Sequence, residues 1–264
     1  MERAEALAAL AATPLARPET LPLLSPAALA SFGRTLVVAP HPDDESLGCG
    51  GAIALLSALG HPVHVLFITD GTLSHPTSRR YPASRLAALR EEEARAALAV
   101  LGAAPTAATF LRLKDRAAPL PGAAGFDTAV ARCRAILDDV EPATLLLPWR
   151  RDPHPDHRAA WGLIDAALES RGRRPRLIEY LIWLWELAVA ADVPRPDEAT
   201  PWRLDISAVL SRKLAAIAAH RSQTTDLIDD DPAAFRLTPE ILAHFSHPWE
   251  LYLEAAGNQP SSDC

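Results

Sequence analysis

The stretch Thr35-Leu36-Val37-Val38-Ala39-Pro40-His41-Pro42-Asp43-Asp44-Glu45 places an apolar run directly before a histidine and three carboxylates. The run is short, contains β-branched residues and stops at Pro40, which indicates a buried strand. A glycine-containing segment and a helix-like apolar stretch follow it, as far as Leu59. Polar ligand atoms gathered between a strand and a helix are what a metal site requires.

Strand-like and helix-like segments alternate along most of the chain. The expected strands are 35–39, 62–69, 107–113, 144–148 and 176–185, and the expected helices are 49–60, 83–101, 127–140 and 157–170. This alternation of helices with continuously apolar strands predicts a Rossmann-like α/β fold, a parallel sheet with helices on both faces. Residues 1–33 are expected to form an N-terminal helical extension and 34–264 a single domain, with 186–203 irregular and a helix near 207–221.

The composition excludes several classes of protein. A length of 264 residues with 49% hydrophobic content fits one large α/β domain. A net charge of −7 argues against nucleic acid or an anionic membrane as the main partner. The three cysteines are too few and too scattered for a disulfide framework or a thiolate zinc site. No convincing signal peptide or membrane span is present, so we expect a cytoplasmic protein.

A second histidine cluster, His154-Pro155-Asp156-His157, follows the expected strand 144–148. Ligands of an open parallel sheet bind beyond the carboxyl ends of its strands. Both histidine clusters lie at such ends, and so do Asp70 and Asp115. We therefore expect these side chains, although far apart in the sequence, to meet at one rim of the sheet.

A catalytic zinc takes three nitrogen or oxygen ligands and leaves one position for water. His41 and Asp44 are close enough in sequence to bind one ion from a single loop. The third ligand would come from His154 or His157, one of which can coordinate while the other faces the substrate. Asp43 is placed to take a proton from water. The pattern thus predicts a metal-dependent hydrolase, and the ligand types accept ferrous iron as well as zinc.

The two motifs, in this order, resemble the PIG-L/LmbE-like family of zinc-dependent N-acetylglucosaminyl deacetylases. The matching residues are 39–45, Thr69-Asp70-Gly71, Arg90 with Glu93, Asp115, 154–157 and 213–223, within roughly 35–225. The resemblance implies zinc held by His41, Asp44 and His157, with Asp43 as the general base. It also implies removal of an acetyl group from an N-acetylated amino-sugar conjugate, a small molecule.

The resemblance assigns further roles around the metal. His154 would steady the oxyanion or protonate the leaving amine, and Asp156 would orient His154. Arg90 and Asp115 would hydrogen-bond sugar hydroxyls. Asp70 could help, although its position beside a glycine also suits a turn.

Other residues carry simpler expectations. Gly48-Cys49-Gly50-Gly51 lacks the Gly-x-Gly-x-x-Gly spacing of a dinucleotide loop, so we expect a tight turn with close packing of helix on sheet. A buried ion pair between Arg90 and Glu93 is the structural alternative to a sugar contact. Of the six tryptophans, Trp149 is the best candidate to stack on a sugar, because it adjoins the second histidine cluster.

Three alternatives to the deacetylase remain open. The first is an amidase that cleaves a bulkier amide with the same groups. The second is a carbohydrate-binding module of the same fold without turnover, although such a module would not need the base Asp43. The third is a metal-dependent phosphoesterase, an enzyme that often uses two metal ions. The sequence carries no signature of an oligomeric state.

Overall fold

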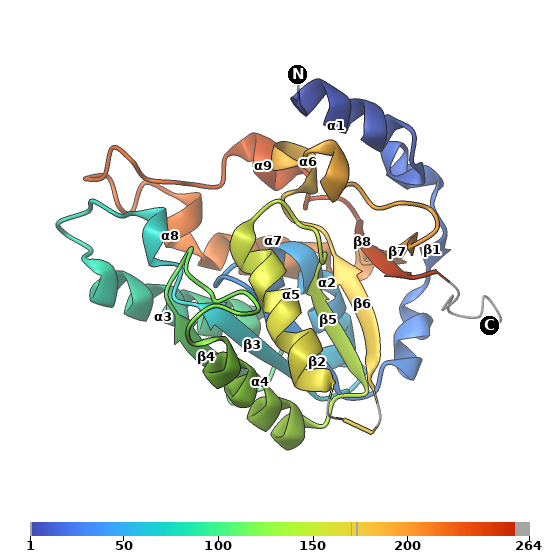
Figure 1. The fold of residues 1–264 in the computed structure, drawn as a ribbon, viewed down its shortest axis with the longest axis horizontal. Helices are drawn as coiled ribbons and strands as arrows, with labels where there is room; N and C mark the ends of the chain where they lie inside the picture. The colour runs from blue at the N-terminus through green and yellow to red at the C-terminus, as the bar shows by residue number, and fades with distance from the viewer. Residues whose placement is uncertain (1, 170, 173, 257–264) are drawn as a thin grey trace.

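A computed structural model describes residues 2–169, 171–172 and 174–256 of the chain. Within these residues one eight-stranded sheet runs in the order β1-β7-β8-β6-β5-β2-β3-β4 (Figure 1). Its strands are β1 (Leu23–Leu24), β2 (Thr35–Ala39), β3 (Val63–Thr69), β4 (Ala108–Leu113), β5 (Thr144–Pro148), β6 (Arg176–Tyr180), β7 (Ala199–Asp205) and β8 (Trp249–Ala255).

The helices of the described residues include four long ones that alternate with the central strands. The α-helices are α1 (Glu2–Ala11), α2 (Asp44–Ala58), α3 (Ala83–Leu101), α4 (Phe126–Val140), α5 (Pro155–Leu168), α6 (Leu184–Leu187), α7 (Leu210–Ala219), α8 (Arg221–Thr224) and α9 (Pro239–Ala243). The 3₁₀ turns are η1 (Pro14–Ala16), η2 (Pro18–Thr20), η3 (Pro26–Ser31), η4 (Thr72–Ser74), η5 (Ala190–Asp192) and η6 (Ser207–Val209).

Helices cover both faces of the sheet, as predicted. Leu36 and Val38 of β2 pack in the same core cluster as residues of α4 and α5. Val37 and Ala39 point to the opposite face and share a cluster with α2, α3 and α7. Since successive strand residues point to opposite sides, a strand buried on both faces must be apolar throughout. Figure 1 shows α4 and α5 in front of the central strands.

The sheet is parallel except at β8, which runs antiparallel to both β6 and β7. Strands β7 and β8 fall in segments that showed no regular strand pattern in the sequence. Pro201 lies within β7, and proline normally argues against a central strand. Glu250 and Glu254 of β8 are buried because each is paired with a cation, Lys213 at 2.8 Å and Arg176 at 2.6 Å. Buried paired glutamates conceal the apolar pattern that would reveal a strand.

Helix α2 begins at Asp44, five residues before the expected start at 49, so the motif carboxylates lie in its first turn. The partial positive charge of a helix N-terminus favours carboxylates there. The glycines lie inside the helix rather than in a tight turn. A Cβ at Gly48 would overlap the ring of Tyr180, and one at Gly51 would overlap Ile206. The predicted close packing is correct, and the predicted turn is wrong.

The N-terminal segment contributes to the sheet as well as to a helix. Strand β1 pairs in parallel with β7 at the edge, and α1 packs near η5. The division of the chain at residue 33 stays a prediction. The strand expected over 176–185 ends at Tyr180, and the chain then forms α6 above the sheet rim. Among the described residues, no helix is both long and apolar enough to cross a membrane.

Candidate metal centre and active site

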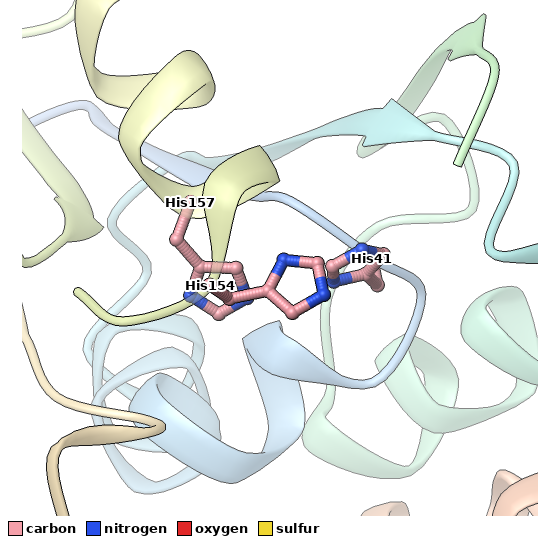
Figure 2. A group of neighbouring side chains, drawn as sticks. All are labelled: His41, His154 and His157. Atoms are coloured by element: carbon pink, nitrogen blue, oxygen red, sulfur yellow. The ribbon is translucent and has the colours of Figure 1, made fainter. Parts of the chain in front are cut away.

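The two histidine motifs lie at the N-termini of α2 and α5, next to the carboxyl ends of the paired strands β2 and β5. The rings of His41, His154 and His157 converge there (Figure 2). Their centroids lie between 4.7 and 5.4 Å apart. Each ring offers a nitrogen within 4.8 Å of the others, so the three together could hold a metal ion.

Asp44 lies between two of these histidines. Its Oδ2 is 3.2 Å from His41 Nδ1 and 3.3 Å from His157 Nε2. Ligand atoms around a tetrahedral ion with bonds of about 2.0–2.1 Å are about 3.3 Å apart. These two separations therefore match neighbouring ligands of one centre. The structure brings His41, Asp44 and His157 together, and it adds His154 to the group.

His157 provides the test of whether a cation fits. It is completely buried, and neither ring nitrogen has a hydrogen-bond partner. Its neighbours are carboxylates, Asp44 at 3.3 Å from Nε2 and Asp152 at 3.4 Å from Nδ1. Burial lowers the pKa of His157, but Asp152 and Asp44 outweigh it and raise that pKa to about 9. An orphaned imidazole among carboxylates is a site that a divalent cation would satisfy, so the residues fit a metal.

The second nitrogen of His41 faces two other carboxylates. Its Nε2 is 3.2 Å from Asp156 Oδ2 and 3.4 Å from Asp115 Oδ1. A proton held on Nε2 by these carboxylates leaves Nδ1, the atom beside Asp44, free to coordinate. Asp156 was predicted to orient His154, and in the structure it contacts that ring through its backbone N–H, which donates to His154 Nδ1 at 3.2 Å, while its carboxylate points elsewhere. That carboxylate contacts His41 and accepts hydrogen bonds from the backbone of Arg116 and Ala118.

Asp152 is a site residue that sequence reasoning missed. Besides facing His157, it accepts hydrogen bonds from the backbone N–H groups of His154 and Trp183. It is completely buried, and its hydrogen bond to the His154 backbone holds the start of the second histidine motif in place. The available signal was its place directly after β5, in the same rim as the other acidic residues.

His154 is set up as a hydrogen-bond donor. Its Nδ1 accepts the backbone N–H of Asp156 at 3.2 Å, so the proton of the neutral ring belongs on Nε2. Burial, together with nearby His41 and His157, lowers the pKa of His154 to about 4. A neutral ring with Nε2–H donates a hydrogen bond and does not coordinate through that atom. This separates the role of His154 from that of His157.

Asp43 is held in a strained backbone conformation, with φ at 154°. Such strain in a non-glycine residue collects at functional sites. Its Oδ2 accepts a hydrogen bond from Arg90 Nη2 at 3.0 Å. Burial raises the pKa of Asp43 to about 6, although Arg90 opposes the rise. A carboxylate with a pKa near neutrality suits proton transfer.

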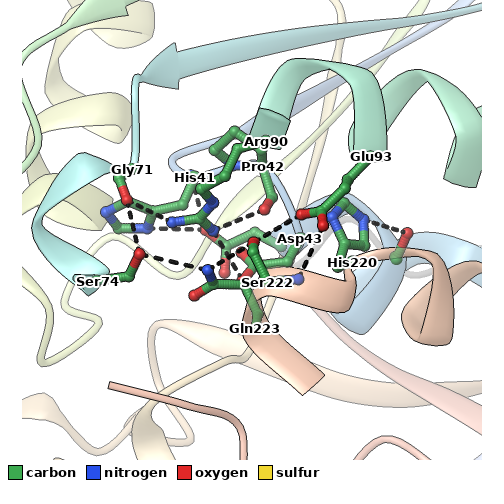
Figure 3. A network of polar contacts seen from close by, with 12 residues as sticks. His41, Pro42, Asp43, Gly71, Ser74, Arg90, Glu93, His220, Ser222 and Gln223 are labelled. Carbon is green, nitrogen blue, oxygen red and sulfur yellow. Dashed lines mark hydrogen bonds and ion pairs between the residues drawn. The ribbon is translucent and has the colours of Figure 1, made fainter. Parts of the chain in front are cut away.

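Arg90 connects the motif loop to the turn after β3. Its Nη1 donates to Gly71 O and its Nη2 to Pro42 O, both at 2.7 Å (Figure 3). Gly71 has φ at 63°, and a Cβ there would overlap the Arg90 guanidinium. The alternative of a buried ion pair is correct for Arg90, but its partner is Asp43 rather than Glu93. Arg90 lines the cavity described below while holding Asp43 in position.

The other two predicted sugar-binding residues have different surroundings. Asp115 lines the cavity, and its Oδ2 accepts the backbone N–H of Leu73 at 2.8 Å. Asp70 is absent from the described lining of the cavity. Its Oδ1 accepts hydrogen bonds from Thr72 and from the backbone of Asp115. The structure therefore supports the turn role for Asp70 and gives no support to a sugar contact.

A second set of polar contacts, which we call the anchoring network, joins the start of α2 and helix α3 to residues 220–222. It consists of Glu45, Ser46, His220, Glu93 and Ser222. Glu45 Oε1 lies 2.8 Å from His220 Nε2 and accepts the Ser46 hydroxyl at 2.6 Å. Glu93 accepts the backbone N–H of Ser222 at 2.8 Å and its hydroxyl at 2.6 Å. Figure 3 shows the contacts of Glu93 on α3 with Ser222 on α8.

A cavity of about 350 Å³ opens beside the clustered histidines. Its polar side includes His41, Asp43, Asp44 and His154. Trp149, the expected sugar-stacking residue, is completely buried, and its Nε1 donates to Asp192 O. The tryptophan in the cavity wall is Trp183, which lies after the end of β6.

Comparisons with known proteins identify a family and several relatives. Residues 36–168 match the family described as PIG-L, GlcNAc-PI de-N-acetylase. The 2′-N-acetylparomamine deacetylase of Streptomyces fradiae is 33% identical over 212 residues, which cover 74% of this chain and 75% of that protein. A probable N-acetyl-alpha-D-glucosaminyl L-malate deacetylase 2 of Bacillus cereus is 28% identical over 204 residues, 76% and 88% of the two chains.

Among solved structures, the N,N′-diacetylchitobiose deacetylase of Pyrococcus horikoshii has a similar fold. Its TM-score is 0.58 at 23% identity, and the match covers 75% of this chain and 73% of that one. At this identity the likeness is one of fold.

Proposed function

The chain belongs to the PIG-L family of de-N-acetylases, and from that premise we propose that it hydrolyses the acetamide of an N-acetylated amino-sugar conjugate. The observation that carries the proposal is Asp44 Oδ2 between His41 Nδ1 and His157 Nε2, with Asp43 beside it at a cavity. We propose the cytoplasm as the place of this reaction and a small molecule as its substrate.

We propose that His41, Asp44 and His157 hold the metal, as zinc or alternatively ferrous iron. When bound, such an ion supplies a Lewis acid that polarises a carbonyl oxygen and lowers the pKa of water. Asp156 and Asp115 face Nε2 of His41, and Asp152 lies 3.4 Å from Nδ1 of His157, so these carboxylates lie beside the ring nitrogens that would not coordinate.

The remaining residues carry the chemistry of the acetamide. Asp43 takes a proton from water as the water oxygen bonds to the carbonyl carbon, and Arg90 keeps the Asp43 carboxylate aligned. His154 donates its Nε2–H to the carbonyl oxygen as negative charge develops there. The C–N bond then breaks, and the nitrogen leaves as a free amine after it receives the proton from Asp43. The products are acetate and the amino sugar.

The experiment is amine release from a panel of N-acetylated sugars and conjugates, with and without a chelator. We expect release that the chelator abolishes and that added zinc or ferrous iron restores. An amidase would release amine only from bulkier amides. If no amide in the panel gives chelator-sensitive release, the deacetylase proposal fails and the binding module becomes the better explanation.

A further inference from the structure

One wall of the active-site cavity is apolar. Its members come from the C-terminal third of the chain: Trp183, Leu187, Phe235, Leu237 and Ile241. All of them lie outside residues 36–168, the part that matches the family. This wall therefore comes from the C-terminal third of the chain, whereas the histidine motifs come from the part that matches the family.

The aromatic rings of this wall extend outward from the catalytic histidine. The Trp183 ring lies 6.5 Å from the His154 ring, and the Phe235 ring lies 5.6 Å from Trp183 in an edge-to-face arrangement. Phe235 and Leu187 are 38% and 56% exposed. A sugar whose acetamide reaches His154 would thus lie along Trp183 and project its aglycone towards Phe235 and Leu187.

The segment that carries Phe235 is held in place by defined contacts. The Phe235 N–H donates to Ser74 O at 2.8 Å, and the Leu237 N–H donates to Gln223 O at 2.9 Å. Further along the chain, Asp231 accepts from both the backbone and the hydroxyl of Thr77, at 2.7 and 2.5 Å. These contacts hold the partly exposed Phe235 ring at the cavity. Because exposing an aromatic ring to water is unfavourable, its fixed position there indicates a binding role.

The charges around the cavity disfavour an anionic aglycone. Its described lining contains four acidic residues, Asp43, Asp44, Asp115 and Glu186, against two arginines. Arg90 and Asp43 pair with each other, which leaves three acidic residues against Arg116. Glu186 belongs to α6, beside Leu187 of the apolar wall, and lies 2.8 Å from His244 Nε2, so a carboxylate placed there would meet a carboxylate that already has a partner.

We propose that the substrate carries an uncharged, apolar aglycone, about the size of an aromatic ring, which packs against Phe235, Leu187 and Trp183. This inference rests on the proposed deacetylase function and specifies the conjugate on which it acts. Burial of an apolar group in a preformed pocket discriminates by about tenfold to hundredfold.

The test compares kcat/KM for four acetamides: free N-acetylglucosamine, its phenyl glycoside, its malate conjugate and its myo-inositol conjugate. We expect the phenyl glycoside to exceed the malate and inositol conjugates by about tenfold to hundredfold. In Phe235→Asp and, separately, in the more exposed Leu187→Ser, this ratio should fall severalfold while the metal content stays at the wild-type level. Leu59→Ser is the matched control, because Leu59 is 52% exposed at the far end of α2.

The outcomes separate the two proposals. Equal rates for all four substrates, or a preference for the malate conjugate, overturn the apolar aglycone and leave deacetylation standing. An unchanged ratio in both wall variants overturns it as well. Absence of amine release from all four substrates removes the deacetylase and the inference together.

Discussion

Two groups of buried polar side chains meet at the first turn of α2, and they differ in how their hydrogen bonds are used. In the anchoring network, Glu45 and Glu93 accept from serine and histidine donors at 2.6–2.8 Å. In the metal cluster, the ring nitrogens of His157 have no hydrogen-bond partner, and carboxylates lie 3.3 and 3.4 Å away. In the anchoring network His220 lacks a partner only at Nδ1, whereas His157 lacks one at both ring nitrogens. Buried groups whose hydrogen bonds are made stabilise the structure, and converging groups whose hydrogen bonds are not made leave room for a ligand.

The largest expected effect is the loss of a cluster ligand. Asp44→Asn removes the charge between His41 and His157, so metal should fall from about one ion per chain to near zero, and kcat/KM about a thousandfold or more. Elemental analysis and amine release measure both quantities. Asp197→Asn is the control, because that side chain is 81% exposed. A variant at position 44 that keeps its metal would contradict the assigned ligand set.

Asp43→Asn should separate catalysis from metal binding. Asparagine keeps the shape of the side chain but cannot take a proton, so kcat should fall by about 10²–10⁴-fold. The metal content should stay at the wild-type level, since Asp43 is not proposed as a ligand. Paired measurements of kcat and metal content check this. Wild-type turnover would remove Asp43 as the base.

Arg90→Lys tests the connection between the turn at Gly71 and the base. A lysine ammonium cannot bridge Gly71 O, Pro42 O and Asp43 as the planar guanidinium does. We expect kcat to fall by about tenfold through a displaced Asp43, with metal retained. Arg95→Lys, on the exposed side of the same helix, is the control. Equal kcat in the two variants would argue against a positioning role.

The smallest effect concerns the anchoring network and depends on pH. Burial lowers the pKa of His220, but Glu45 outweighs burial and raises that pKa above its usual value. A histidine with a raised folded-state pKa contributes stability below about pH 6.5 and loses it as the pH rises through the raised value. As the pH rises from 6 to 9, wild type should therefore lose more unfolding free energy than His220→Gln. Urea unfolding of both metal-loaded proteins measures the difference, and parallel losses would refute the charged His220–Glu45 pair.

The central part of the fold could be predicted from local patterns. Strand β2 and helix α3 have the expected bounds, because a continuous apolar run and a helical period are local properties. Strands β7 and β8 escaped prediction because Pro201 and the buried Glu250 depend on partners distant in the sequence. A lysine more than thirty residues away decides whether a glutamate can lie inside a sheet.

In the site, too, some features could be predicted from the sequence and others depend on residues that are distant in the sequence. His41, Asp44 and His157 could be grouped from motif spacing and from the rule that strand ends share a rim. The residues that face the other ring nitrogen of each histidine could not be predicted. Asp156, for example, contacts His41 Nε2 from a different loop, and the distance between the two loops depends on the folded structure. The choice between Trp149 and Trp183 likewise depends on where β6 ends, and that boundary was expected five residues too late.

The position of β8 has a consequence for how the protein matures. This strand is made after all the others described, yet it lies inside the sheet, between β6 and β7. Its Glu250 accepts the backbone N–H groups of Gly51 and Ala52 in the helix that carries Asp44. During synthesis, the hydrogen bonds from Glu250 to α2 can therefore form only after residues 249–255 have emerged from the ribosome. A chain released before that point would expose the edges of β6 and β7, which could then pair with other chains and aggregate.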